Sequence, residues 1–127
     1  MAVKLDGVRI LDISRVLTGP YCSMVLADLG AEVIKVEPPG RDETRTWPPF
    51  YPNGESGHYL ALNRNKKGMV LDLKHPEGKK VLFDLARKSA VVIENFTPGV
   101  VKRLGIDYET MKKINPKIIY CSISETL

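Results

Sequence analysis

The feature of this sequence that most restricts its fold is a series of short apolar segments separated by segments with helical character. Residues 8–13, 33–37, 68–74, 90–96 and 117–123 are rich in β-branched side chains, and most of these segments show little alternation with polar residues. Strands of this kind are buried on both faces, as in a parallel sheet covered by helices. They predict five strands of one sheet.

The intervening segments predict the helices that cover this sheet. Pro20 suits a first helical turn, and Gly30 suits the position just after a helix end. Residues 76–88 form the clearest helix, and two short helices flank Gly105. The alternation predicts an α/β fold, a Rossmann-like open and mainly parallel sheet with helices on both faces. No repeat or linker interrupts it, so we expect a single domain, residues 1–127.

One segment breaks this alternation. Residues 41–57 read RDETRTWPPFYPNGESG and are rich in proline, glycine and charge, with aromatic residues between them. The composition predicts a long loop. Long loops in compact domains are usually functional or disordered, and the sequence leaves both interpretations open.

The charge of the chain is uneven. Residues 1–63 hold 6 Lys and Arg against 8 Asp and Glu, whereas residues 64–127 hold 13 against 7. The basic half suits an anionic partner (nucleic acid, acidic lipid or a phosphorylated cofactor), although a solvated basic face is the plainer interpretation. No nucleic-acid-binding motif is visible, and we expect no such partner.

Other sequence signals bear on the compartment. No apolar run approaches the roughly 18 residues of a membrane span, and the N-terminus lacks the pattern of a signal peptide. Only two cysteines are present, Cys22 and Cys121. With no export signal, they fit a reducing compartment. We expect a cytoplasmic protein without a membrane partner.

Common cofactor motifs are missing or incomplete. The first strand–helix turn reads RVLTGP, with one glycine where a dinucleotide-binding turn has three. There is no P-loop. Cys22, His58, His75 and Cys121 are too scattered for a metal site, and we expect both histidines at the surface and no metal. The helix start after Gly19 still attracts an anion.

Three carboxylates are candidate nucleophiles or bases because they lie at or near strand ends: Asp12, Asp72 (within the third predicted strand) and Glu94. The alternative is that they cap helices or pair with lysines. Cys22 near a helix start is either a thiolate of lowered pKa or a small buried apolar residue. From these residues alone, the chain is an α/β domain suited to an anion.

Four stretches in order resemble the N-terminal region of the class III CoA-transferases, also called the CaiB/BaiF family. They are LDGVRILDISRVLTGPYCSMVLADLGAEVIKVEPPG, LNRNKKGMVLDLKHPEG, VVIENFTPGVVKRLG and INPKIIYCSIS. The resemblance implies a CoA-binding part of a longer chain, in a family whose subunits interlock as dimers. Family members continue after CSIS into a glycine-rich segment, whereas this sequence reads ETL and stops, which suggests truncation or a frameshift.

The resemblance also implies which residues contact coenzyme A. Val16, Leu17 and Thr18, after the first strand, line the cofactor, and residues 71–74, near the third strand, contact its nucleotide end. Asn95 bonds the pantetheine amides, and Arg103 lies near the phosphates. Many members have arginine at the position of Pro38. The implied cofactor-binding residues are Val16, Leu17, Thr18, Leu71, Asp72, Leu73, Lys74, Asn95, Phe96, Thr97 and Arg103.

The family's nucleophilic aspartate lies downstream of the matching region, so the resemblance implies no catalytic residue in this chain. We expect the CoA-binding part of an enzyme that transfers CoA between an acyl-CoA and a carboxylic acid, inactive alone. Two alternatives stay open. One is a non-enzymatic assembly module or split subunit, as a homo-oligomer or with a separate C-terminal partner chain. The other is a fragment of an α-methylacyl-CoA racemase-like enzyme.

Overall fold

The computed structural model describes residues 4–124, and its centre is one five-stranded parallel sheet. The strand order is β3-β2-β1-β4-β5. The strands are β1 (Arg9–Asp12), β2 (Glu32–Glu37), β3 (Lys66–Val70), β4 (Val91–Glu94) and β5 (Ile119–Ser122). The predicted fold class is confirmed. The departure from the family pattern at residues 125–127 lies outside the described residues.

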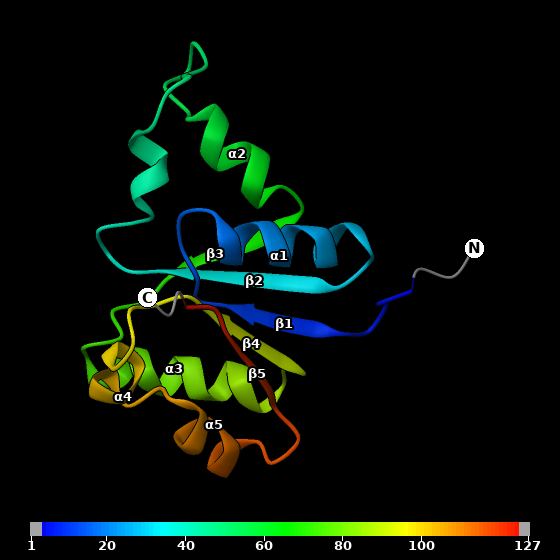
Figure 1. Ribbon diagram of the computed structural model, residues 1–127, viewed down its shortest axis with the longest axis vertical. Coiled ribbons are helices and arrows are strands. Elements are labelled where there is room, and N and C mark those ends of the chain that lie inside the picture. Colours follow the sequence, from blue (N-terminus) through cyan, green and yellow to red (C-terminus); the bar gives the residue numbers. More distant parts are fainter. Residues whose placement is uncertain (1–3, 125–127) are drawn as a thin grey trace.

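Helices cover both faces of the sheet (Figure 1). On one face lie α1 (Thr18–Asp28) and α2 (Gly57–Asn63), and on the other lie α3 (Pro76–Arg87), α4 (Val100–Leu104) and α5 (Tyr108–Ile114). A 3₁₀ helix, η1 (Glu43–Thr46), precedes α2. None of the helices described for residues 4–124 combines the length and apolar character needed to cross a bilayer.

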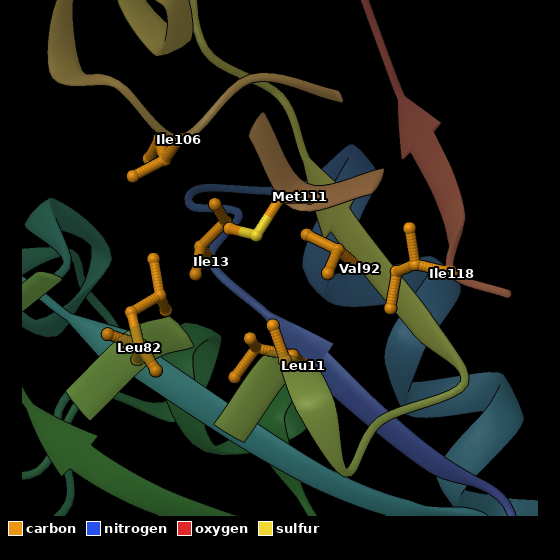
Figure 2. Packing of buried hydrophobic residues seen from close by; sticks show 9 residues of the cluster. Leu11, Ile13, Leu82, Val92, Ile106, Met111 and Ile118 are labelled. Atoms are coloured by element: carbon orange, nitrogen blue, oxygen red, sulfur yellow. The ribbon is translucent and has the colours of Figure 1, made fainter. Parts of the chain in front are cut away.

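Each face of the sheet has its own apolar core. Successive strand side chains point to opposite faces, so Ile10 joins the cluster under α1 and Leu11 joins the cluster under α3 and α5. Figure 2 shows the second cluster, where Leu82 of α3 and Met111 of α5 approach Leu11. Burial on both faces explains why the strand sequences are continuous apolar runs.

The predicted helix ends agree with the backbone. Gly30 follows α1 with φ +106°, and its N–H donates to the Ala27 carbonyl oxygen at 3.0 Å. At the start of α3, Pro76 occupies the first turn, and the exposed His75 accepts a hydrogen bond from the Glu77 N–H through Nδ1 at 3.2 Å. Capping therefore fixes both helices at their expected positions.

The predicted third strand, residues 68–74, is wrong in its bounds. Strand β3 begins earlier, at Lys66, and ends at Val70. The chain turns next because the Asp72 carboxylate accepts the Lys74 N–H at 3.0 Å, a local bond that competes with the sheet. Asp72 thus follows the strand. The predicted loop 41–57 is also more ordered than expected, since it contains η1 and a bridge from Phe50 to Ser56.

We predict that Leu82→Ala lowers the free energy of unfolding by about 2–5 kcal/mol, because it leaves a cavity in the α3 core. Leu82 is 0% exposed. Val81→Ala is the matched control in the same helix, and its side chain is 39% exposed. Urea unfolding followed by circular dichroism gives both values. Equal losses for the two variants would contradict the described core.

Candidate functional site

A cleft of about 490 Å³ opens where the carboxyl ends of the strands meet. Strand order reverses between β1 and β4, and open α/β sheets bind ligands at such a reversal. The loops after four strands and helix α4 form the walls. The lining residues are Ile13, Ser14, Arg15, Val36, Glu37, Pro38, Pro39, Gly40, Arg41, Asp42, Asp72, Leu73, Lys74, Phe96, Val100 and Leu104.

The loop after β1 is held by the loop after β4. The Arg15 N–H donates to Asn95 Oδ1 at 2.9 Å, and Asn95 Nδ2 donates to the Arg15 carbonyl oxygen at 2.7 Å. Gly19 allows the chain to fold this closely, because a Cβ there would lie 2.1 Å from Ser14 Cβ. Asn95 therefore fixes one wall of the cleft through two backbone bonds.

The loop after β2 is organised around the buried Glu37 carboxylate. It accepts hydrogen bonds from Arg45 Nη2 at 3.0 Å, Arg41 Nε at 2.5 Å and the Tyr59 hydroxyl at 2.6 Å. Burial by itself raises the pKa of Glu37, but the bonds from Arg45, Tyr59 and Arg41 outweigh it and hold the pKa below its ordinary value. Glu37 is therefore ionised and tied to residues of the long loop.

The loop after β3 packs closely against the start of α3. A Cβ on Gly78 would lie 2.0 Å from the Asp72 carbonyl oxygen, so only glycine fits there. This contact brings Asp72, Leu73 and Lys74 to the cleft. This role of Gly78 was not predictable from the sequence, because the clash is with the Asp72 backbone, which precedes the helix.

Three cationic side chains reach the cleft with exposed surfaces: Arg15, Arg41 and Lys74. The Arg15 guanidinium lies 5.6 Å from the centre of the Phe96 ring. Of the carboxylates that line the cleft, those of Glu37 and Asp42 are buried and paired with cations, whereas Asp72 is exposed and accepts the Lys74 N–H. The exposed positive charge beside apolar walls suits an anionic ligand with an apolar part.

The structure brings some of the predicted cofactor residues together and leaves others beside the cleft. Asp72, Leu73, Lys74 and Phe96 line it. Arg103 lies exposed on α4, with Nη1 3.4 Å from the Cβ position of Gly99. Six predicted residues do not line the cleft. Four of them adjoin lining residues in sequence (Val16, Leu71, Asn95 and Thr97), whereas Leu17 and Thr18 lie further along the chain from Arg15, the last lining residue of the loop after β1.

Sequence reasoning missed part of the lining. It did not select Arg15, Arg41 or Asp42, nor Val100 and Leu104 of α4. The unusual composition of residues 41–57 was the available signal, since a long loop that begins with Arg41 and Asp42 is expected to be functional or disordered.

The buried carboxylate Asp12 has a structural environment. It accepts bonds from the Ser14 N–H at 2.9 Å, from Ser23 Oγ at 2.5 Å and from Lys66 Nζ at 3.3 Å, and also from Ser14 Oγ. Burial lowers the pKa of Lys66 to about 8 although Asp12 favours its charged form. Glu94, 1% exposed, accepts the Phe96 N–H at 2.9 Å. These contacts match the capping and pairing alternative.

Two expectations from the sequence are wrong, the thiolate alternative for Cys22 and the surface position of His58. Burial, followed by the nearby Cys121 and Asp12, raises the pKa of the half-buried Cys22, so the thiolate alternative is wrong. His58 is half-buried against Trp47, with ring centres 5.1 Å apart, instead of at the surface.

Within residues 4–124, no group of three or more His, Cys, Asp or Glu side chains is arranged to hold a metal ion.

The chain belongs to CoA-transferase family III, whose sequence profile matches residues 5–125. It is 51% identical over 121 residues to the human succinyl-CoA:glutarate CoA-transferase, covering 94% of this chain and 28% of that enzyme. It is 49% identical over 124 residues to a formyl-CoA:oxalate CoA-transferase from Afipia carboxidovorans, covering 97% of this chain and 29% of the relative.

A solved structure shows the same fold. The crystal structure of a CaiB/BaiF family protein from Brucella suis superimposes with a TM-score of 0.90 at 41% identity, covering 96% of this chain and 33% of that chain. The family predicted from the four sequence stretches is therefore confirmed. The chain spans less than a third of the length of the human and Afipia enzymes.

We predict that Glu37→Gln destabilises the protein by about 3–5 kcal/mol at pH 7, because it removes the charge that Arg45 and Arg41 face. The pKa of Glu37 is lowered on folding, so its contribution is complete above the ordinary value near 4.5 and is lost as the pH falls through the folded value.

The measurement is urea unfolding of the wild type and Glu37→Gln at pH 7 and at successively lower pH. The difference between the two proteins narrows below pH 4.5 if the account is right. Glu32→Gln is the control, since that carboxylate is paired with Arg9 and Lys67 near the surface. A difference that stays constant with pH would contradict the role of the Glu37 charge.

Proposed function

We propose that residues 1–127 form a single CoA-binding domain of a class III CoA-transferase. The observation that carries this proposal is the cleft at the strand-order reversal, which combines exposed Arg15, Arg41 and Lys74 with apolar walls. Membership of CoA-transferase family III supports coenzyme A as the ligand. A compact anion would not need the apolar walls, and an uncharged ligand would not need the cations.

The chemistry of CoA matches the two kinds of lining. Its diphosphate and 3′-phosphate are anionic, and arginine and lysine bind phosphate through charge-assisted hydrogen bonds. Its pantetheine arm is largely apolar and suits Val36, Phe96 and Leu104. Arg41 and Lys74 are placed to meet phosphates, and Arg103 on the exposed side of α4 extends the positive charge. Pro38 at the cleft contributes shape without charge.

The remaining predicted contacts are part of the same proposal. Val16, Leu17 and Thr18 lie against the cofactor after β1, and Leu71 supports the loop that carries Lys74. Thr97 and Asn95 flank Phe96 on the other wall. Asn95 donates to a pantetheine amide only by sharing the Nδ2 group that now bonds the Arg15 carbonyl oxygen at 2.7 Å.

We assign no catalytic nucleophile to this chain. Asp12 and Glu94 are buried and bonded, and Asp72 accepts a bond from its own turn. Acyl exchange therefore needs groups from further polypeptide, in the same chain or in a partner, and the 127 residues alone do not turn over an acyl-CoA. The relatives named above are CoA-transferases, which favours transferase over racemase chemistry.

We also propose that the protein is cytoplasmic.

We predict that the wild-type chain binds CoA and that Lys74→Ala weakens binding about three- to tenfold, because it removes one phosphate contact. Isothermal titration calorimetry at fixed ionic strength gives both dissociation constants. Lys117→Ala is the matched control: it removes the same charge from an exposed position before β5, away from the cleft.

Two results would contradict the proposed function. One is a folded wild-type chain that does not bind CoA. The other is an equal loss of affinity for Lys74→Ala and Lys117→Ala, which would show a general charge effect in place of a site. A second comparison uses CoA that lacks the 3′-phosphate. We expect the wild type to bind this ligand more weakly than CoA, and Arg103→Ala to reduce the affinity for it less than it reduces the affinity for CoA.

A further inference from the structure

A buried ion pair lies behind the cleft. Lys35 Nζ of β2 contacts Asp42 Oδ2 of the following loop at 2.9 Å, and their side chains are 2% and 1% exposed. Burying two charges is unfavourable unless further hydrogen bonds satisfy them. Lys35 is not a lining residue, and Asp42 lines the cleft with both of its carboxylate oxygens already bonded within the protein. The pair therefore needs an explanation other than direct ligand contact.

Both members of the pair also bond the loop after β1. Lys35 Nζ donates to the Ser14 carbonyl oxygen at 3.3 Å, and Asp42 Oδ2 accepts the Val16 N–H at 3.3 Å. These two backbone groups lie on either side of Arg15. The ion pair thus holds the segment that carries one of the three exposed cations of the cleft.

The backbone held in this way is in an unfavourable conformation. Val16 has φ +73°, in the left-handed region that β-branched residues rarely adopt. Such a conformation persists only where surrounding contacts hold it. The Asp42 bond to the Val16 N–H and the Asn95 bonds to Arg15 are contacts of this kind.

The other oxygen of Asp42 is also occupied. Oδ1 accepts the Thr44 N–H at 3.0 Å and the Thr44 hydroxyl at 2.8 Å. Burial raises the pKa of Asp42, but Thr44 and Lys35 outweigh burial and hold the pKa below its ordinary value. Asp42 is therefore a charged, fully bonded link between the loop after β2 and the loop after β1.

We propose that Lys35 and Asp42 are positioning residues that hold residues 14–16 so that Arg15 stands at the cleft beside Phe96. The identity of the ligand rests on the proposed CoA site, but the positioning of residues 14–16 is a property of the chain without ligand. The pair acts through the backbone: Lys35 lies outside the cleft lining, and Asp42, which is part of the lining, has both carboxylate oxygens bonded within the protein. Its loss should therefore change the loop whether or not CoA is present.

The direct test is Asp42→Asn, which keeps the size of the side chain. An asparagine has one acceptor oxygen, so it cannot serve Thr44 as well as Val16 and Lys35. We expect the Val16 amide to exchange with solvent at least about tenfold faster, since exchange reports local opening. We expect the dissociation constant for CoA to rise roughly tenfold, as Arg15 is no longer held in place.

Lys66→Met is the matched control. Lys66 belongs to a second buried pair: its side chain is 2% exposed, and it bonds Asp12 and the Pro20 carbonyl oxygen of α1 and makes no hydrogen bond to Val16. It should destabilise the fold while leaving exchange at Val16 and CoA affinity close to the wild type. ¹⁵N-resolved hydrogen exchange and calorimetry measure both effects for each variant.

The inference is overturned if Asp42→Asn leaves Val16 exchange unchanged, or if Lys66→Met accelerates it equally. A wild type that does not bind CoA would contradict the proposed ligand, and the Val16 measurement would still decide the positioning role. Should Asp42→Asn not fold, Asp42→Glu keeps the charge and displaces the carboxylate. The same faster exchange at Val16 is then expected, and an unchanged rate would refute the role.

Discussion

The structure depends on the burial of charged side chains at the carboxyl ends of its strands. Asp12 ends β1, Lys35 and Glu37 lie late in β2, and Glu94 ends β4, and all four are at most 3% exposed. Buried charges must be paired and hydrogen-bonded. Many of their partners come from the segments that follow these strands, such as Asp42 for Lys35, Arg41 for Glu37 and the Phe96 N–H for Glu94, although the cation paired with Asp12 is Lys66 of β3. Satisfying the charges thus orders the loops, and the ordered loops form the cleft.

This arrangement separates two kinds of charge. The buried charges hold the loops in place, whereas Arg15 and Lys74 keep exposed surface for a ligand. Arg41 belongs to both groups, since its Nε bonds the buried Glu37 and its side chain is exposed at the cleft. A site whose cations stand on anchored loops loses little conformational freedom when an anion binds. For a chain of CoA-transferase family III, this is the property we propose for binding the phosphates of CoA.

The sequence predicted the layers of the fold because they depend on local patterns. Apolar runs indicated a sheet buried on both faces, and Gly30 indicated the end of α1. The end of β3 was not predictable in the same way, since Leu71 and Leu73 continue the apolar pattern while the Asp72 turn stops the strand. A turn formed by one side-chain bond leaves almost no periodic signal.

The cleft was predictable only in part for a related reason. Leu73, Lys74 and Phe96 were expected from the resemblance and do line it, but the contacts that shape it join residues far apart in sequence. Asp42 bonds an amide 26 positions away, and Asn95 bonds one 80 positions away. Neither pairing has a spacing that a single sequence reveals.

The most direct measurement is a CoA titration of the ¹⁵N-labelled chain, with the shift of each backbone amide followed by NMR. We expect the largest changes at residues 14–16, 40–42, 72–74 and 96, which line one cleft or adjoin its lining. Changes concentrated instead on the basic outer face of α3, around Lys79, Lys80 and Arg87, would contradict it. That result would show binding by surface charge, without a formed site at the strand ends.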